Sequence, residues 1–268
     1  MKPRSSRTAG DAERILAAIK ATRDVSAGVR YDLEIADGAS RAPSILLLPH
    51  AEGPCPAALL LHGFASRKER MADTIGEALL RHGVAALSLD LPLHGERSES
   101  PGDLKGGDSV RLLGTWRDAI GEARLALDYL ASHEAVDEQR LAIVGYSLGS
   151  FLANIVAADS PEVRAMVLAA SGDLPEGLPF ESLVRAVVDP LRAVRSVRGR
   201  PLLMVNGRFD RSVRPSQAER LFAAAHEPKT MRWYGGGHWR PPPEIEYAAE
   251  WLACQLESEQ KTKRRMSS

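Results

Sequence analysis

Two kinds of hydrophobic pattern follow one another along the chain. Val29, Tyr31, Leu33 and Ile35 alternate with charged residues, which is the two-residue period of a half-buried strand near the edge of a sheet. The later apolar runs are continuous, and continuous apolar strands indicate burial on both faces, as in a parallel sheet covered by helices. These runs are Ile45–Leu48, Ala57–Leu61, Val84–Leu89, Leu141–Val144, Ala165–Ala169 and Leu202–Val205.

Helical patterns separate the apolar runs. The segments that begin at Ser66, Thr115 and Ser216 each place an acidic residue three positions later, ahead of apolar residues at helical spacing, which is a capping-box signal. The first of these helices is expected to end at Gly83, and a last helix is expected to begin in the proline run 241–243. Strands that alternate with helices predict the α/β class, with a doubly wound, mostly parallel sheet flanked by helices.

One domain, residues 29–256, is expected from this pattern. Residues 1–28 are expected to form a terminal helix with a flexible flank, and residues 257–268 a flexible tail. The segment from Ser171 to Gly199 has room for one regular helix around Leu183 and a short second helical piece after Pro190. A segment of that size predicts a minimal cap over the sheet edge.

Charge and cysteine content exclude several functions. The chain has 35 basic and 35 acidic residues and a formal net charge of zero, so there is no electrostatic argument for binding nucleic acid or an anionic membrane. The sequence has neither a signal-peptide pattern nor a run long enough to span a bilayer, and a cytoplasmic protein is therefore expected. Cys55 and Cys254 show no metal-ligand spacing, so no metal site is expected.

A short glycine-flanked serine motif carries the first chemical signal. It reads Gly145-Tyr146-Ser147-Leu148-Gly149 and matches G-x-S-x-G. The motif follows a predicted strand and precedes an apolar stretch, which is the strand, sharp turn and helix of a nucleophile elbow. Ser147 would then stand exposed above the sheet at the start of a helix.

A serine hydroxyl needs a base to become a nucleophile at neutral pH. In hydrolases with such an elbow, the acid and then the histidine follow the serine along the chain. Asp210 comes just after the run Leu202–Val205, and His238 follows a short predicted strand and three glycines. We therefore predict a Ser147–Asp210–His238 triad, with Asp173 as the alternative acid because it too follows a predicted strand.

Backbone N–H groups are expected to form an oxyanion hole. One should come from Leu148, directly after the nucleophile, and the other from Phe64 or Ala65, in the loop after the run Ala57–Leu61. His62 precedes this loop and is expected to brace it rather than to take part in catalysis.

Five motifs are spread over the chain: His62-Gly63-Phe64, residues 90–95, residues 145–149, residues 207–210 and Gly237-His238. Together they resemble the α/β-hydrolase superfamily over residues 29–256, in a form similar to dienelactone-hydrolase-like and prolyl-oligopeptidase-like serine esterases. The resemblance implies an enzyme that cleaves carboxylic esters of small molecules through an acyl-enzyme, without a cofactor. Dienelactone hydrolases proper carry cysteine where this chain has Ser147.

Other functions remain compatible with the same residues. A thioesterase, amidase or acyltransferase would use the same triad, and a catalytically silent member of the fold could serve as a binding protein. The small expected cap and the polar loop 95–114 favour small, water-soluble acyl esters. Arg97 and Arg240 are interpreted as solvated surface residues, with contact to a polar or acidic substrate group as the alternative.

Overall fold

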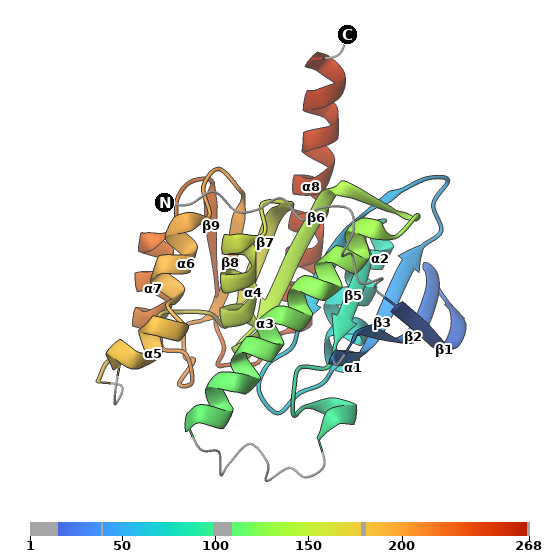
Figure 1. Cartoon of the computed structure of the whole chain (residues 1–268). Helices are drawn as coiled ribbons and strands as arrows, with labels where there is room; N and C mark the ends of the chain where they lie inside the picture. Colours follow the sequence, from blue (N-terminus) through green and yellow to red (C-terminus); the bar gives the residue numbers. More distant parts are fainter. Residues whose placement is uncertain (1–15, 39, 99–108, 178–180, 267–268) are drawn as a thin grey trace, which may run out of the picture.

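A single mixed sheet organises the computed structural model, which describes residues 16–38, 40–98, 109–177 and 181–266. The described strands lie in the order β1-β2-β3-β5-β4-β6-β7-β8-β9 (Figure 1). Antiparallel pairing joins β1 to β2, β2 to β3 and β3 to β5, and all later pairs are parallel. The strands are β1 (Leu16–Val25), β2 (Gly28–Asp37), β3 (Ser40–Pro49), β4 (Cys55–Leu61), β5 (Ala85–Leu89), β6 (Val136–Tyr146), β7 (Val163–Ala169), β8 (Leu202–Gly207) and β9 (Lys229–Tyr234).

Helices cover both faces of the sheet and bury its apolar strands. On one face α3 (Ser109–Ser132), α4 (Leu148–Asp159), α6 (Pro190–Ser196) and α7 (Pro215–Ala224) pack on a core cluster. On the other face lie α1 (Lys68–Met71), a π-helical turn (Ala72–Gly76), α2 (Glu77–Arg81) and α8 (Pro242–Met266). The predicted doubly wound α/β architecture is therefore confirmed. The parallel strands end at one edge of the sheet, and Ser147, Asp210 and His238 follow β6, β8 and β9 there.

Both ends of the chain differ from expectation. The helix expected within residues 1–28 is wrong for residues 16–25, which form β1, an edge strand paired along its whole length with β2. Its alanine-rich sequence lacks the alternation of a half-buried strand because nearly all of it is exposed, so pairing rather than patterning decides its structure. The tail expected at 257–268 continues α8 as far as Met266, since its Glu, Gln, Lys and Arg residues favour helix (Figure 1).

Two helices begin at residues other than those that the capping-box signals predict. The helix expected from Thr115 begins at Ser109, and α1 begins after Arg67 with no side-chain cap from Ser66. The helix that continues through α2 ends at Arg81, and Gly83 adopts a φ of +72°, as the predicted stop requires.

Two short helices separate β7 from β8, as the minimal cap predicts. They are α5 (Glu181–Val187) and α6, and Asp189 caps α6 by accepting from the Arg192 N–H at 3.1 Å. The expected polar wall at 95–114 lies partly outside the described residues; Gly95–Arg97 form a 3₁₀ turn.

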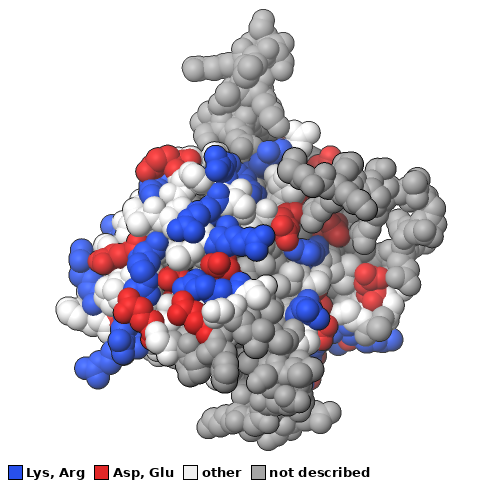
Figure 2. Space-filling view, turned by 60° about the vertical axis from the view of Figure 1, so that its left-hand side comes forward, with Lys and Arg blue, Asp and Glu red and all other residues white. Residues whose placement is uncertain are grey.

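The described surface mixes charges of both signs. Figure 2 shows Lys and Arg side chains interspersed with Asp and Glu on the face that carries α5, α6 and α7. Among the helices in the described ranges, none combines the length and apolar character needed to cross a bilayer.

Candidate active site

Ser147 occupies a strained turn between β6 and α4. Its backbone has φ +51° and ψ −117°, a conformation that residues other than glycine rarely adopt. Its N–H donates to the Ala169 carbonyl of β7 at 2.9 Å, which fixes the turn to the sheet. The flanking glycines allow close packing, because a methyl group at Gly145 would overlap the Gly149 carbonyl and one at Gly149 would overlap the Leu61 carbonyl.

The loops that carry Asp210 and His238 lie side by side after β8 and β9. Gly207 and Tyr234 are register partners at the ends of these strands. Beyond them the Arg208 N–H donates to the Tyr234 carbonyl at 3.0 Å, and the Phe209 N–H donates to the Gly236 carbonyl at 2.9 Å. The strand pairing therefore extends into the loops and brings the carboxylate to the histidine.

The three predicted triad side chains meet in one chain of contacts. His238 Nε2 lies 3.0 Å from Ser147 Oγ, and His238 Nδ1 lies 2.8 Å from Asp210 Oδ2. A carboxylate can only accept, so Nδ1 carries the proton and Nε2 accepts from the serine hydroxyl. The other Asp210 oxygen accepts from the Ser212 and Val213 N–H groups at 2.8 and 3.0 Å, which holds this buried carboxylate in place.

Asp173, the alternative acid, is bound to other partners. Arg185 donates to both of its carboxylate oxygens at 3.0 and 3.2 Å, and Arg220 donates to one of them at 3.1 Å. Burial opposes its ionisation, but the hydrogen bonds from Arg185 and Arg220 outweigh burial and lower the pKa of Asp173. The carboxylate that reaches His238 is that of Asp210.

The predicted oxyanion-hole segments adjoin Ser147. A methyl group at Gly63 would lie 2.9 Å from the Tyr146 ring and 3.3 Å from Ser147 Cβ, so the loop that carries Phe64 passes directly beside Ser147. Leu148 is the first residue of α4. Its N–H belongs to the first helical turn, where backbone donors have no partner within the helix.

His62 braces this loop, as the sequence predicts. Its Nδ1 donates to the Gly63 carbonyl at 2.8 Å, and its Nε2 accepts from the Leu91 N–H at 3.1 Å. Only the neutral imidazole can donate from Nδ1 and accept at Nε2 at the same time. Burial lowers the pKa of His62 to about 4.

A buried ion pair that was not predicted from the sequence joins the loop after β5 to the start of α1. Asp90 is fully buried after β5, and its carboxylate accepts from the Lys68 N–H at 2.8 Å and from Lys68 Nζ at 3.0 Å. Burial opposes the charge on Lys68, but the hydrogen bonds that its ammonium donates to Glu96 and Asp90 outweigh burial and raise the pKa of Lys68. The signal was available, since Asp90 stands at a strand end just as Asp210 does.

Tyr146 also supports the histidine and was not predicted to. Its hydroxyl donates to the His238 carbonyl at 2.9 Å, and its ring centroid lies 5.4 Å from that of His238. Tyr146 is the variable residue before the serine in G-x-S-x-G, and that position offered no pattern to identify its role. Tyr146 therefore ties the histidine loop to the elbow.

The two singled-out arginines have different surroundings. Arg97 donates to both carboxylate oxygens of the buried Glu122, at 2.5 and 2.9 Å, which gives it a structural ion pair. Arg240 lies over the Tyr146 ring, with its guanidinium carbon 4.2 Å from the ring centroid. The expectation of a solvated surface residue is thus wrong for both side chains.

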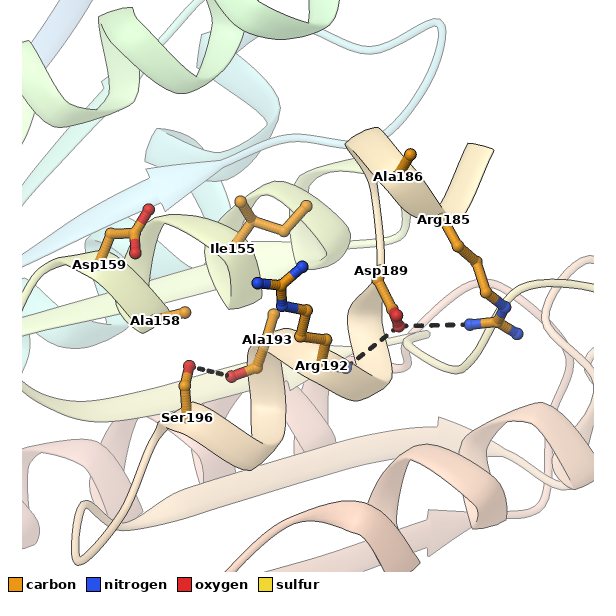
Figure 3. Close-up of a pocket in the computed structure, with 9 residues that line it drawn as sticks. All are labelled: Ile155, Ala158, Asp159, Arg185, Ala186, Asp189, Arg192, Ala193 and Ser196. Carbon is orange, nitrogen blue, oxygen red and sulfur yellow. Dashed lines mark hydrogen bonds and ion pairs between the residues drawn. The ribbon is translucent and has the colours of Figure 1, made fainter. Parts of the chain in front are cut away.

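A cavity of about 360 Å³ lies away from Ser147, between α4, α5 and α6 (Figure 3). Ile155 lines it eight residues beyond Ser147, which corresponds to roughly 12 Å along a helix. Arg185 and Asp189 on its wall are paired with each other at 3.3 Å. The cavity is therefore separate from the candidate active site. In the described part of the chain, no three His, Cys, Asp or Glu side chains group as a metal site requires.

Sequence comparison identifies the family. The model of the "Alpha/beta hydrolase family" matches residues 58–256. The chain belongs to the α/β-hydrolase family. An uncharacterized protein of Mycobacterium tuberculosis is 28% identical over 189 residues, which are 68% of this α/β-hydrolase chain and 62% of that protein. Hydrolase acrC of Aspergillus aculeatus is 31% identical over 155 residues, which are 52% of this chain and 33% of that protein. The chain thus spans less than two thirds of the length of these relatives.

Solved structures share the fold over most of this α/β-hydrolase chain. Acetyl xylan esterase 1 from Thermoanaerobacterium sp. JW/SL YS485 superposes with a TM-score of 0.73 at 19% identity, covering 90% of this chain and 88% of that one. A cold-adapted esterase from an Arctic intertidal metagenomic library superposes with a TM-score of 0.70 at 20% identity, covering 88% of this chain and 98% of that one. At these identities the likeness establishes the fold alone.

Proposed function

We propose that this protein is a serine hydrolase that cleaves carboxylic esters of small molecules through an acyl-enzyme. The observation that carries the proposal is the contact chain from Ser147 Oγ to His238 Nε2 at 3.0 Å and from His238 Nδ1 to Asp210 Oδ2 at 2.8 Å. The esterase names of the structural neighbours agree with it.

In the proposed reaction, each residue has one role. His238 takes the proton from Ser147 Oγ as this oxygen attacks the ester carbonyl, and it returns the proton to the leaving alcohol. Asp210 holds the ring tautomer and stabilises the imidazolium that forms. The N–H groups of Phe64 and Leu148 bind the developing oxyanion, a donor contribution of about 3 kcal/mol each in comparable sites. Water activated by His238 then hydrolyses the acyl-enzyme.

Labelling and turnover test the proposal together. A fluorophosphonate probe should label the wild-type protein and fail to label Ser147→Ala, and hydrolysis of p-nitrophenyl acetate should fall at least 10⁴-fold in that variant. A Ser147→Ala variant with turnover within tenfold of wild type contradicts the assignment. Matched thioester and anilide substrates distinguish an esterase from a thioesterase or amidase, and absence of labelling identifies a silent binding protein.

Two aspartate variants test whether Asp210 or Asp173 is the acid that acts with His238. Asp210→Asn should lower kcat by about 10³- to 10⁴-fold because the histidine loses its tautomer and its charge partner. Asp173→Asn should lower the melting temperature but keep kcat within about threefold, since its carboxylate pairs with Arg185 and Arg220. The reverse pattern would assign the acid to Asp173.

A further inference from the structure

Arg240 has an unusual environment beside the proposed catalytic residues. It stands two residues after His238, half-buried, with its guanidinium carbon 4.2 Å from the centroid of the Tyr146 ring. A terminal nitrogen lies 3.9 Å from Met71 Sδ. The Tyr146 ring in turn lies 5.4 Å from the His238 ring. One aromatic ring therefore separates this cation from the proposed general base.

The charge of Arg240 has no carboxylate partner among the described residues. Two other half-buried arginines, Arg185 and Arg220, both pair with the Asp173 carboxylate. Burial, with a smaller contribution from the positive charge of Arg70, lowers the pKa of Arg240 to about 10. An unpaired, partly desolvated guanidinium gains more from an anion than a solvated one does.

Arg70 extends the positive region to the exposed rim of the site. Its guanidinium carbon lies 5.5 Å from the centroid of the Trp239 ring, and it likewise forms no ion pair within the described residues. Trp239 follows His238 directly, is 67% exposed, and has its ring centroid 6.5 Å from that of His238. Two cations without a carboxylate partner in the described residues thus lie against the Tyr146 and Trp239 rings, which neighbour the histidine.

We infer that Arg240, assisted by Arg70, forms an anion subsite, so that the substrate is an ester carrying a carboxylate on its acyl or alcohol part. This inference rests on the proposed ester hydrolysis at Ser147. A planar carboxylate matches the guanidinium fork and can accept two parallel N–H bonds. The subsite binds a part of the substrate that does not react, so its contribution is mainly to KM.

Matched neutral and anionic esters test the subsite. Ethyl 4-acetoxybenzoate and 4-acetoxybenzoate differ by a charge on the alcohol part, and p-nitrophenyl hexanoate and p-nitrophenyl hydrogen adipate differ by a charge on the acyl part. In at least one pair, the wild-type KM should be about tenfold or more lower for the anionic ester. Arg240→Gln should remove this preference and keep kcat for the neutral ester within threefold. The pair that responds tells which part carries the charge.

Three controls separate a binding role from a structural one. Arg240→Lys should keep part of the preference, Arg70→Gln should reduce it, and Arg81→Gln, which removes an exposed arginine paired with Glu246, should leave it unchanged. Equal KM values within both pairs, or equal losses on both members of a pair in Arg240→Gln, would overturn the inference while ester cleavage by Ser147 stands.

A binding measurement keeps the inference independent of turnover. In Ser147→Ala, calorimetric titration should show tighter binding of 4-acetoxybenzoate than of its ethyl ester, and the difference should disappear in Ser147→Ala/Arg240→Gln. If the wild type cleaves no ester, the proposed function fails, and this titration alone decides whether the anion subsite exists. Equal affinities for the two compounds would refute it.

Discussion

Buried polar side chains near Ser147 are held by directed hydrogen bonds on more than one side. His62 donates to one backbone carbonyl and accepts from one backbone N–H, at 2.8 and 3.1 Å, so only the neutral ring satisfies both partners. Asp210 accepts two backbone N–H groups on one oxygen and meets the His238 ring with the other. Residues so constrained supply fixed geometry at the site, and the lowered pKa of His62 links the stability of the fold to pH.

The first prediction concerns acid destabilisation through His62. Its pKa in the folded protein is about 4, below the ordinary 6.5, so between these values the unfolded chain binds more protons. The free energy of unfolding should therefore fall as the pH is lowered through this window, by about 2 kcal/mol at pH 5 from this residue alone. Urea unfolding at pH 7.5 and pH 5 measures the fall.

His62→Asn provides the comparison, because its amide can still donate to the Gly63 carbonyl but does not titrate. The variant should be less stable at pH 7.5 and lose less stability than wild type on going to pH 5. An identical loss in the two proteins would show that other groups account for the acid sensitivity.

At the scale of elements, the sequence predicted the strands and helices whose apolar residues follow a regular pattern. It missed the strand whose structure depends on pairing with a neighbouring strand. The buried strands and most helices were found because their apolar positions follow a period of two, a continuous run or a helical period. The edge strand β1 was missed, because its exposed residues carry no such pattern and its structure comes from hydrogen bonds to β2. The residues of the proposed triad could be predicted from the sequence because Ser147, Asp210 and His238 each follow a strand. Tyr146 and Lys68 were missed because their roles depend on contacts between distant segments.

The second prediction tests the close packing of α4 against β4. A methyl group at Gly149 would overlap the backbone carbonyls of Leu61 and His62, neither of which can move aside without disturbing the sheet. Gly149→Ala should therefore destabilise the fold by about 1–3 kcal/mol or more. It should also lower ester hydrolysis, because the shift displaces the Leu148 N–H beside the nucleophile.

Gly121→Ala is the matched control, because it makes the same substitution inside α3, where the added methyl meets no atom within 4 Å apart from its chain neighbours and the backbone of its own helix. It should stabilise the protein by about 0.5–1 kcal/mol through helix propensity and leave hydrolysis unchanged. Thermal unfolding with activity assays measures both effects. A Gly149→Ala protein as stable and active as Gly121→Ala would contradict the packing argument.

For the whole molecule, the size of the cap sets what the proposed site can accept. The described cap between β7 and β8 consists of α5 and α6, of seven residues each. Arg185 of α5 is engaged with Asp173, Glu181 and Asp189, so this segment presents an ion-pair network. An enzyme with a long acyl tunnel needs a continuous apolar wall, and these two short helices do not supply one.

The third prediction follows from this small cap. Each CH₂ of an acyl chain contributes about 0.8 kcal/mol only where an apolar pocket buries it. In a series of p-nitrophenyl esters from acetate to dodecanoate, kcat/KM should therefore be highest for short acyl chains and should not rise beyond about eight carbons.

Rates are measured below the critical micelle concentration of each ester, with Ser147→Ala as the background. A long buried channel would instead raise kcat/KM by close to tenfold for every two carbons, because 1.4 kcal/mol corresponds to a factor of ten. Such a rise continuing past eight carbons would show that the cap encloses far more apolar surface than α5 and α6 provide.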